Sequence, residues 1–362
     1  MNAPVITSAT AVFEIGNHYL NFALGVCEQD KVNVLHYQSA PICGCMGNRI
    51  VDAGQLTEQI RKTKETVEKH FHILLNQAYY TAPLFIGTSE KFAVERKSLM
   101  EEMRKIASAT AVNLTPSTGG MQAVERMLPV SSKGKSNTLL LDLGYSTMGV
   151  VIVKNGQCAQ QTMLGRSILQ TVTDMLTARG ATLQEAKTIL RRAGSAVTPI
   201  DELRFRVGEG SMRKSELSQY IQTELQTMLS PLREKLQRFL EAGMPVYISG
   251  EGTSLTGIRD FLSDFFGTEV QEADWGGMLT EGEYAEAAQR QRNSLMLCAL
   301  LQNQPWLYPS EEEEKKKQKK PKRPGKILRS ITNLPNRLFG DNNEGKTYDD
   351  IDNTNGRETD NQ

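Results

Sequence analysis

The sequence contains no apolar run long enough to cross a membrane. A transmembrane helix needs about 20 mostly apolar residues, and no run of even about 18 occurs in the 362 residues. The first residues, MNAPVITSATAVF, also lack the basic region and the apolar region of a signal peptide. We therefore expect neither a membrane span nor a secretory leader.

Cysteine is scarce, and neither sign of charge dominates. Five cysteines, an odd and low number, argue against a disulfide-stapled secreted domain and suit a reducing cytosol. Cys43-Gly44-Cys45 is too closely spaced for a usual zinc site and has no second pair, so we expect a plain loop. The 42 basic and 42 acidic side chains cancel, and 362 residues are too many for one ordinary core. We expect two lobes and an extension.

The stretch 137–158, NTLLLDLGYSTMGVVIVKNGQC, has the pattern of a ligand-binding hairpin. Apolar residues 139–141 end on the carboxylate of Asp142, a tight turn follows at 143–146, and a second apolar run spans 150–153. Asn155-Gly156 then favours a type I′ turn. Such a turn offers backbone N–H groups to a phosphate, and the carboxylate can hold the water of a Mg²⁺ ion. Taken alone, the stretch fits an ordinary β-hairpin equally well.

Two other stretches repeat parts of this pattern. Residues 12–18, VFEIGNH, place Glu14 and Gly16 after an apolar run, and 246–253, VYISGEGT, run into glycines before a helical pattern at 255–262. Two carboxylate-ended hairpins and a later strand, glycine turn and helix are typical of the actin/Hsp70-type nucleotide-binding fold. We predict an α/β, actin-like two-lobe fold of duplicated ribonuclease-H-like lobes with a disordered C-terminal tail. The lobes should face each other across a phosphate cleft.

Apolar periodicity predicts the remaining elements. Strands are expected at 11–16, 20–27, 32–39, 78–87, 111–114 and 202–207. Helices are expected at 55–71, 95–107, 118–128, 215–240 and 284–301. Pro231 should kink or break the helix at 215–240.

The order of six motifs resembles the bacterial cell-division protein FtsA. They are VFEIGNHYL, GCMGNRIVDAGQLTEQI, LLLDLGYSTMGVVIVKNG, LGRSILQTVTDML, GATLQEAKTILRRAGSA and VYISGEGTSLTGIRDFL. Each motif is weak alone, but together they are specific, and they span roughly residues 11–302. The resemblance implies a protein that binds ATP between two lobes, sits at the inner membrane and recruits the tubulin-like division protein FtsZ.

The sequence departs from the family in three places. Residues 88–113 provide only one helix and a connector where the family carries an inserted subdomain, which puts FtsA-style filament contacts in doubt. Tyr145 and Ser146 replace two glycines of the phosphate loop, and bulkier residues obstruct close approach of the backbone to a phosphate. The helix that usually touches the nucleoside has Lys187 and Leu190 at the matching places.

The resemblance also implies roles for individual residues. Asp142 would hold Mg²⁺, and Glu14, the matching carboxylate of the opposite lobe, would position the water as the catalytic residue. The implied ATP-binding set is Gly16, Asn17, His18, Asp142, Gly144, Tyr145, Ser146, Thr147, Lys187, Gly250, Glu251, Gly252 and Thr253. Because the phosphate loop is crowded, we expect a slow ATPase at most.

We predict five regions along the chain. Residues 1–136 with 285–308 form the first lobe and 137–284 the second, followed by a basic linker at 309–325, an amphipathic membrane-binding segment at 326–340 and an acidic disordered tail at 341–362. The amphipathic face comprises Ile327, Ile331, Leu334 and Leu338, with Leu328, Phe339, Lys326 and Arg329 beside it. An apolar stripe beside a polybasic run is typical of an interfacial anchor for anionic lipids. A tail without structure is the alternative, and nucleic-acid binding is disfavoured because no aromatic residues interleave the basic run.

Two classes of function compete at this point. The first is an actin-like adaptor that holds division machinery at the cytoplasmic face of the inner membrane and associates with FtsZ. The second is a filament-forming or pilus-platform ATPase that assembles with itself, and a scaffold that has lost nucleotide is a third interpretation. The predicted membrane-binding segment favours the adaptor.

Overall fold

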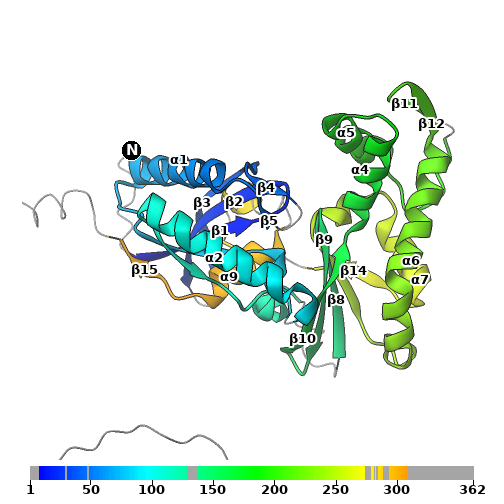
Figure 1. Ribbon diagram of the computed structural model, residues 1–362. Helices are drawn as coiled ribbons and strands as arrows, with labels where there is room; N and C mark the ends of the chain where they lie inside the picture. Colours follow the sequence, from blue (N-terminus) through cyan, green and yellow to red (C-terminus); the bar gives the residue numbers. More distant parts are fainter. Residues whose placement is uncertain are drawn as a thin grey trace, which may run out of the picture. The chain divides into compact units, whose positions relative to one another are not determined.

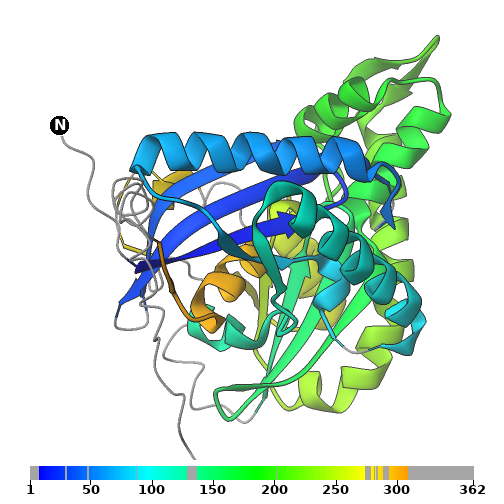
Figure 2. The ribbon, with the colours of Figure 1, turned by 60° about the vertical axis from the view of Figure 1, so that its left-hand side comes forward.

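The computed structural model describes residues 8–28, 31–46, 49–87, 89–128, 137–201, 203–273, 279–280, 282, 284–287 and 293–308. Two sheets of similar topology organise this part of the chain, and Figures 1 and 2 show them from two directions. The first sheet has the order β3-β2-β1-β6-β7, with β15 attached to β1, and the second has the order β10-β9-β8-β13-β14. The predicted regions from residue 309 onward, including the amphipathic segment at 326–340, lie outside the described residues.

The strands of the first sheet are β1 (Ser8–Ile15), β2 (Tyr19–Glu28), β3 (Lys31–Pro41), β6 (Gln77–Thr81), β7 (Asn113–Pro116) and β15 (Trp306–Leu307). Those of the second are β8 (Asn137–Leu143), β9 (Thr147–Lys154), β10 (Gln157–Arg166), β13 (Val246–Ser249) and β14 (Val270–Glu272). Two small hairpins pair β4 (Cys45–Met46) with β5 (Arg49–Ile50) and β11 (Arg204–Val207) with β12 (Gly210–Arg213).

The α-helices are α1 (Ala53–Phe71), α2 (Ala93–Thr110), α4 (Ile168–Ala178), α5 (Leu183–Ala193), α6 (Lys214–Glu241), α7 (Ile258–Phe266) and α9 (Ser294–Gln302). Short 3-10 helices are η1 (Pro83–Phe85), η2 (Glu90–Phe92), η3 (Gln122–Met127) and η4 (Glu251–Ser254). Among the described residues, no helix combines the length and the apolarity that a membrane crossing requires.

The same pairing pattern builds both sheets. β1 pairs antiparallel with β2 and parallel with β6, and β8 pairs antiparallel with β9 and parallel with β13. Glu14 and Asp142 therefore occupy matching places near the ends of β1 and β8. The expected type I′ turn after β9 is confirmed, because Asn155 and Gly156 both have positive φ.

Two hydrophobic cores flank the second sheet. On β8, Leu139 and Leu141 belong to one core, whereas Leu140 between them belongs to the other, which also contains β1, α1 and α9 side chains. A strand that is buried on both faces is continuously apolar, as 139–141 are. The predicted lobe boundaries at 136/137 and 284/285 stay a proposal.

Several predicted elements were wrong. The strand expected at 78–87 is confirmed only in its first half, as β6. It ends at Thr81, because Pro83 cannot donate to a ladder and starts the helical turn η1. The helix expected at 118–128 is only η3, after a turn that contains Gly120 at φ 56°. Pro231 does not break α6, whose buried side chains continue on both sides of it, and a kink at this residue stays a prediction.

The helix expected at 284–301 is not continuous. Asn293 has non-helical φ and ψ of −89° and 84°, and α9 starts after it. The Asn293 side chain accepts a hydrogen bond from the Met296 backbone N at 3.0 Å, so it caps the helix.

Candidate functional site

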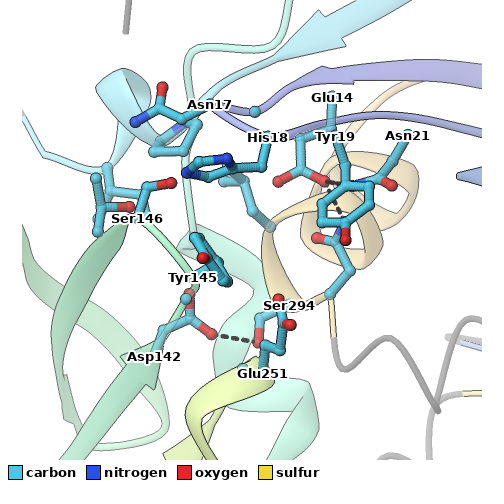
Figure 3. Close-up of a pocket in the computed structure, with 18 residues that line it drawn as sticks. Glu14, Asn17, His18, Tyr19, Asn21, Asp142, Tyr145, Ser146, Glu251 and Ser294 are labelled. Atoms are coloured by element: carbon cyan, nitrogen blue, oxygen red, sulfur yellow. Dashed lines mark hydrogen bonds between the residues drawn. The ribbon is translucent and has the colours of Figure 1, made fainter. Parts of the chain in front are cut away.

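A pocket lies where the turns of the two sheets face each other, and Figure 3 shows the residues that line it. Its lining combines the β1–β2 turn, the β8–β9 turn, the start of η4 and the start of α9. The lining residues are Glu14, Gly16, Asn17, His18, Tyr19, Asn21, Pro83, Ile86, Asp142, Gly144, Tyr145, Ser146, Thr147, Gly250, Glu251, Asn293, Ser294 and Leu295. The cavity has a volume of about 100 Å³.

Most residues predicted for the site are brought together here. Glu14, Gly16, Asn17, His18, Asp142, residues 144–147, Gly250 and Glu251 all line the pocket. Gly252 and Thr253 are buried but do not line it, and Lys187 lies beside it, with its Nζ over the rings of two lining tyrosines. Their roles in binding stay predictions.

Gly250 shows why a glycine is needed at the end of β13. Its φ is 86°, and a Cβ there would come within 2.7 Å of the Leu143 carbonyl carbon. The missing side chain lets the start of η4 approach the β8–β9 turn. Glu251 is thereby placed in the pocket wall.

Asp142 is buried and is held by two serine hydroxyl groups. Ser249 Oγ and Ser294 Oγ donate to its Oδ1 at 2.8 Å and 2.7 Å. Burial raises the pKa of Asp142 above its ordinary value, and the two serine hydrogen bonds oppose this shift.

Glu14 is also buried, and amide groups surround it. Asn21 Nδ2 donates to Glu14 Oε2 at 2.8 Å, and Asn293 Nδ2 donates to the same oxygen. Burial raises the pKa of Glu14, while both asparagine hydrogen bonds lower it and the charge of Asp142 raises it further. Both carboxylates thus have protein donors, and the adjacent residues Asn293 and Ser294 serve one each.

The β8–β9 turn is fastened to the start of α4. Ser167 N and Gln170 N donate to the carbonyl oxygens of Ser146 and Tyr145 at 3.0 Å and 3.1 Å. The Tyr145 hydroxyl group contacts Thr173 Oγ1 at 2.8 Å. Backbone and side-chain hydrogen bonds therefore tie the loop that contains Tyr145 and Ser146 to α4.

The charge of the lining is one-sided. Glu14, Asp142 and Glu251 line the pocket, and none of the described lining residues is a lysine or arginine. Burial lowers the pKa of His18, which favours the neutral imidazole at pH 7. A nucleotide phosphate would need a cation to offset these carboxylates.

Several residues in or beside the pocket were not predicted from the sequence. Asn21, Ser249, Asn293 and Ser294 hold the carboxylates, and Tyr19, Pro83, Ile86 and Leu295 complete the walls. A signal existed for one pair, because an asparagine and a serine before an apolar run mark a helix start. The signal is hidden because the apolar periodicity of 284–301 also fits one longer helix.

Comparison with solved structures identifies the fold. The structure is similar to a PilM–PilN type IV pilus biogenesis complex, with a TM-score of 0.56 and 12% identity over 82% of this chain and 98% of that chain. It is similar to MreB5 of Spiroplasma citri bound to ADP, with a TM-score of 0.52 and 11% identity over 82% of this chain and 95% of that chain. For MreB 5 of the same organism bound to AMPPNP, the TM-score is 0.52, with 12% identity over 86% of this chain and 98% of that chain.

The chain therefore has the actin-like two-lobe fold. Identities this low show the fold alone. No family model matches the sequence, and no curated protein matches it.

Proposed function

We propose that this protein is an actin-like adaptor of bacterial cell division that binds Mg²⁺-ATP between its lobes and hydrolyses it slowly at most. One observation carries the nucleotide part of the proposal: Glu14 and Asp142, at matching strand ends of the two sheets, line a single pocket with both hairpin turns. Figure 3 shows the two carboxylates entering that pocket from different strands.

The donor set of the pocket fits a magnesium nucleotide, but its present volume does not. Carboxylate oxygens can coordinate Mg²⁺ or accept hydrogen bonds from its bound waters. The turns can offer backbone N–H groups to phosphate oxygens. The cavity of about 100 Å³ is well below the roughly 300–1,000 Å³ of ordinary ligand pockets. Binding therefore needs the cleft to open.

Each residue would have a limited part in this chemistry. Asp142 would orient the hydrated metal, which offsets the phosphate charge when bound. Glu14 would hold and orient a water on the opposite side. The bulk of Tyr145 in the phosphate turn supports slow turnover, since it keeps the backbone away from the ligand.

Calorimetry with Mg²⁺-ATP tests the nucleotide part. Asp142→Ala should weaken binding in the presence of Mg²⁺ at least about tenfold, and should change Mg²⁺-free binding far less, because the carboxylate acts through the metal. Asp201→Ala is the matched control, since Asp201 makes an ion pair with Lys214 outside the pocket. Equal losses with and without Mg²⁺ would mean that Asp142 only shapes the turn.

The membrane part of the proposal rests on residues 326–339. Ile327, Ile331, Leu334 and Leu338 would insert into an anionic leaflet, assisted by the basic run at 315–323. Four aliphatic side chains contribute roughly 1.5–3 kcal/mol each when fully buried. The conformational entropy lost when the helix becomes ordered largely offsets this gain. The basic run should therefore be needed, and rising salt should weaken binding.

Sedimentation with anionic vesicles tests this anchor. Deleting residues 326–339, or introducing Ile331→Asp, should abolish co-sedimentation while the folded body remains intact. Thr332→Asp is the matched control, because it adds the same charge next to the apolar face rather than within it. If the deletion and Ile331→Asp both bind as the parent does, the segment is a linker.

A second candidate is a pilus-platform adaptor, favoured by the similarity to the PilM–PilN complex. Recruitment of FtsZ to vesicles that carry this protein separates the two candidates. Retention of FtsZ supports the division adaptor, and its absence supports the pilus role.

A further inference from the structure

Side chains of the protein bridge the gap between the two hairpin turns. His18 of the β1–β2 turn donates through Nε2 to Gln170 Oε1 of α4 at 2.5 Å. The His18 ring also meets the Tyr145 ring edge-on, with 4.4 Å between the ring centroids. Figure 3 shows His18 and Tyr145 side by side between the two strands that carry the carboxylates.

The bridge is fixed in its orientation on the side of the second sheet. Gln170 Nε2 donates to Asp174 Oδ1 at 2.5 Å, and Asp174 pairs with Arg166 at 3.1 Å. Because its amide nitrogen is used in this way, the Gln170 oxygen must point toward His18. The acceptor for His18 is thus preorganised.

Lys187 closes the same gap at a second point. Its Nζ lies 5.0 Å from the ring centroid of Tyr19 on β2 and 4.8 Å from that of Tyr145. A cation over two aromatic faces is held by both rings. Burial lowers the pKa of Lys187 and the charge of Glu251 raises it.

We infer that His18, Tyr145, Gln170 and Lys187 form a clasp that holds the cleft shut in the place where a nucleotide would bind, and that a nucleotide must displace it. The inference deepens the proposed function and rests on it for the identity of the ligand. The remaining cavity of about 100 Å³, which His18 and Tyr145 line, is too small for a nucleotide, so the clasp must be displaced. The clasp is an autoinhibitory contact, because it holds the cleft closed without a ligand and thereby opposes nucleotide binding.

Removing one member of the clasp should shift the population toward the open cleft. A hydrogen bond of ordinary strength corresponds to about a fivefold change in an equilibrium constant, and apparent affinity rises with the fraction of competent molecules. Gln170→Ala and His18→Ala should each raise the affinity for Mg²⁺-ATP about fivefold. The double variant should gain little beyond either single variant, because both remove the same contact.

Hydrogen exchange without any nucleotide supplies an independent measurement. The Ser167 and Gln170 amides, which hold the β8–β9 turn, should exchange several times faster in both variants. Gln237→Ala is the matched control, since Gln237 also donates to an acid four residues further along a helix, Glu241, but makes no contact across the cleft. It should change neither affinity nor exchange.

The outcomes separate the clasp from the proposed function. Faster exchange with no Mg²⁺-ATP binding in any variant would support the clasp and reject the nucleotide role. Unchanged exchange in Gln170→Ala and His18→Ala would overturn the clasp. Unchanged exchange together with weaker ATP binding in His18→Ala would identify His18 as a nucleotide ligand instead.

Discussion

The two sheets place a carboxylate at the same position and satisfy it from different strands. In the first sheet, Glu14 lies opposite Asn21 of β2 and beside Thr81 of β6, and it accepts from Asn21. In the second, Asp142 lies opposite Gly149 of β9 and beside Ser249 of β13, and it accepts from Ser249. The two sheets therefore share a topology but supply the hydrogen-bond donors of their carboxylates from different strands.

Neighbouring side chains explain the difference. A Cβ on Gly149 would lie 3.3 Å from the Asp142 Cβ, so the antiparallel neighbour leaves space but offers no donor. In the first sheet the antiparallel neighbour, Asn21, is the donor. The parallel neighbour, Thr81, does not donate, and its buried hydroxyl group has no hydrogen-bond partner among the described residues. Each carboxylate takes one donor from its own sheet and a second from the start of α9.

The largest expected effect comes from Asn293. Asn293→Ala removes both the cap of α9 and a donor to the buried Glu14, so we expect the free energy of unfolding to fall by about 2–4 kcal/mol. Ser294→Ala is the comparison, because Ser249 still donates to Asp142, and it should cost about 1 kcal/mol. Urea unfolding of both variants measures the difference. Equal losses would mean that the two carboxylates depend on α9 equally.

The pH dependence of stability should reveal the buried carboxylates. Burial raises the pKa of Asp142 above its ordinary 3.8, so between 3.8 and the folded-state pKa the folded protein keeps a proton that the unfolded chain has lost. The free energy of unfolding therefore falls as pH rises through this window, by on the order of 1 kcal/mol per pH unit. The Asp142→Asn variant has no titrating group at this position. Its free energy of unfolding relative to the parent should therefore increase as pH rises through the window.

The free energy of unfolding of Glu14→Gln relative to the parent should likewise increase as pH rises above 4.5, because burial is the largest influence on the pKa of Glu14 and raises it. Thermal unfolding between pH 4 and pH 8 measures both variants. A difference between variant and parent that does not depend on pH would contradict the raised pKa. Asp201→Asn is a suitable control, since its ion pair with Lys214 lowers the pKa of that exposed carboxyl group.

The smallest expected effect concerns Thr81 and its counterpart Ser249. Thr81→Val replaces an unpaired buried hydroxyl group by a methyl group of similar size, so we expect a stabilisation of about 1 kcal/mol. Ser249→Ala removes a donor to Asp142 and should destabilise by about 1–2 kcal/mol. Thermal midpoints of the two variants should move in opposite directions. A loss of stability in Thr81→Val would show that its hydroxyl group has a partner.

Local pattern was sufficient to predict much of the fold. The carboxylate-ended hairpins, the Asn155-Gly156 turn and most helices follow from alternation, helical periodicity and turn chemistry over short stretches. The prediction failed where several local signals competed. The strand expected at 78–87 was extended too far along an apolar run, because Pro83 prevents ladder pairing beyond β6. At 284–301 the helical pattern hid the start of a new helix at Ser294.

The sequence by itself determined that carboxylates end two similar hairpins and that glycines follow β13, because these features depend on neighbours a few residues away. Only the tertiary structure decided which donors reach Glu14 and Asp142, and that His18 meets Gln170 across the cleft. These contacts join segments far apart in the chain, so they depend on how the two sheets and α9 pack. Local periodicity carries no information about that packing, whereas the volume left for a ligand depends on it entirely.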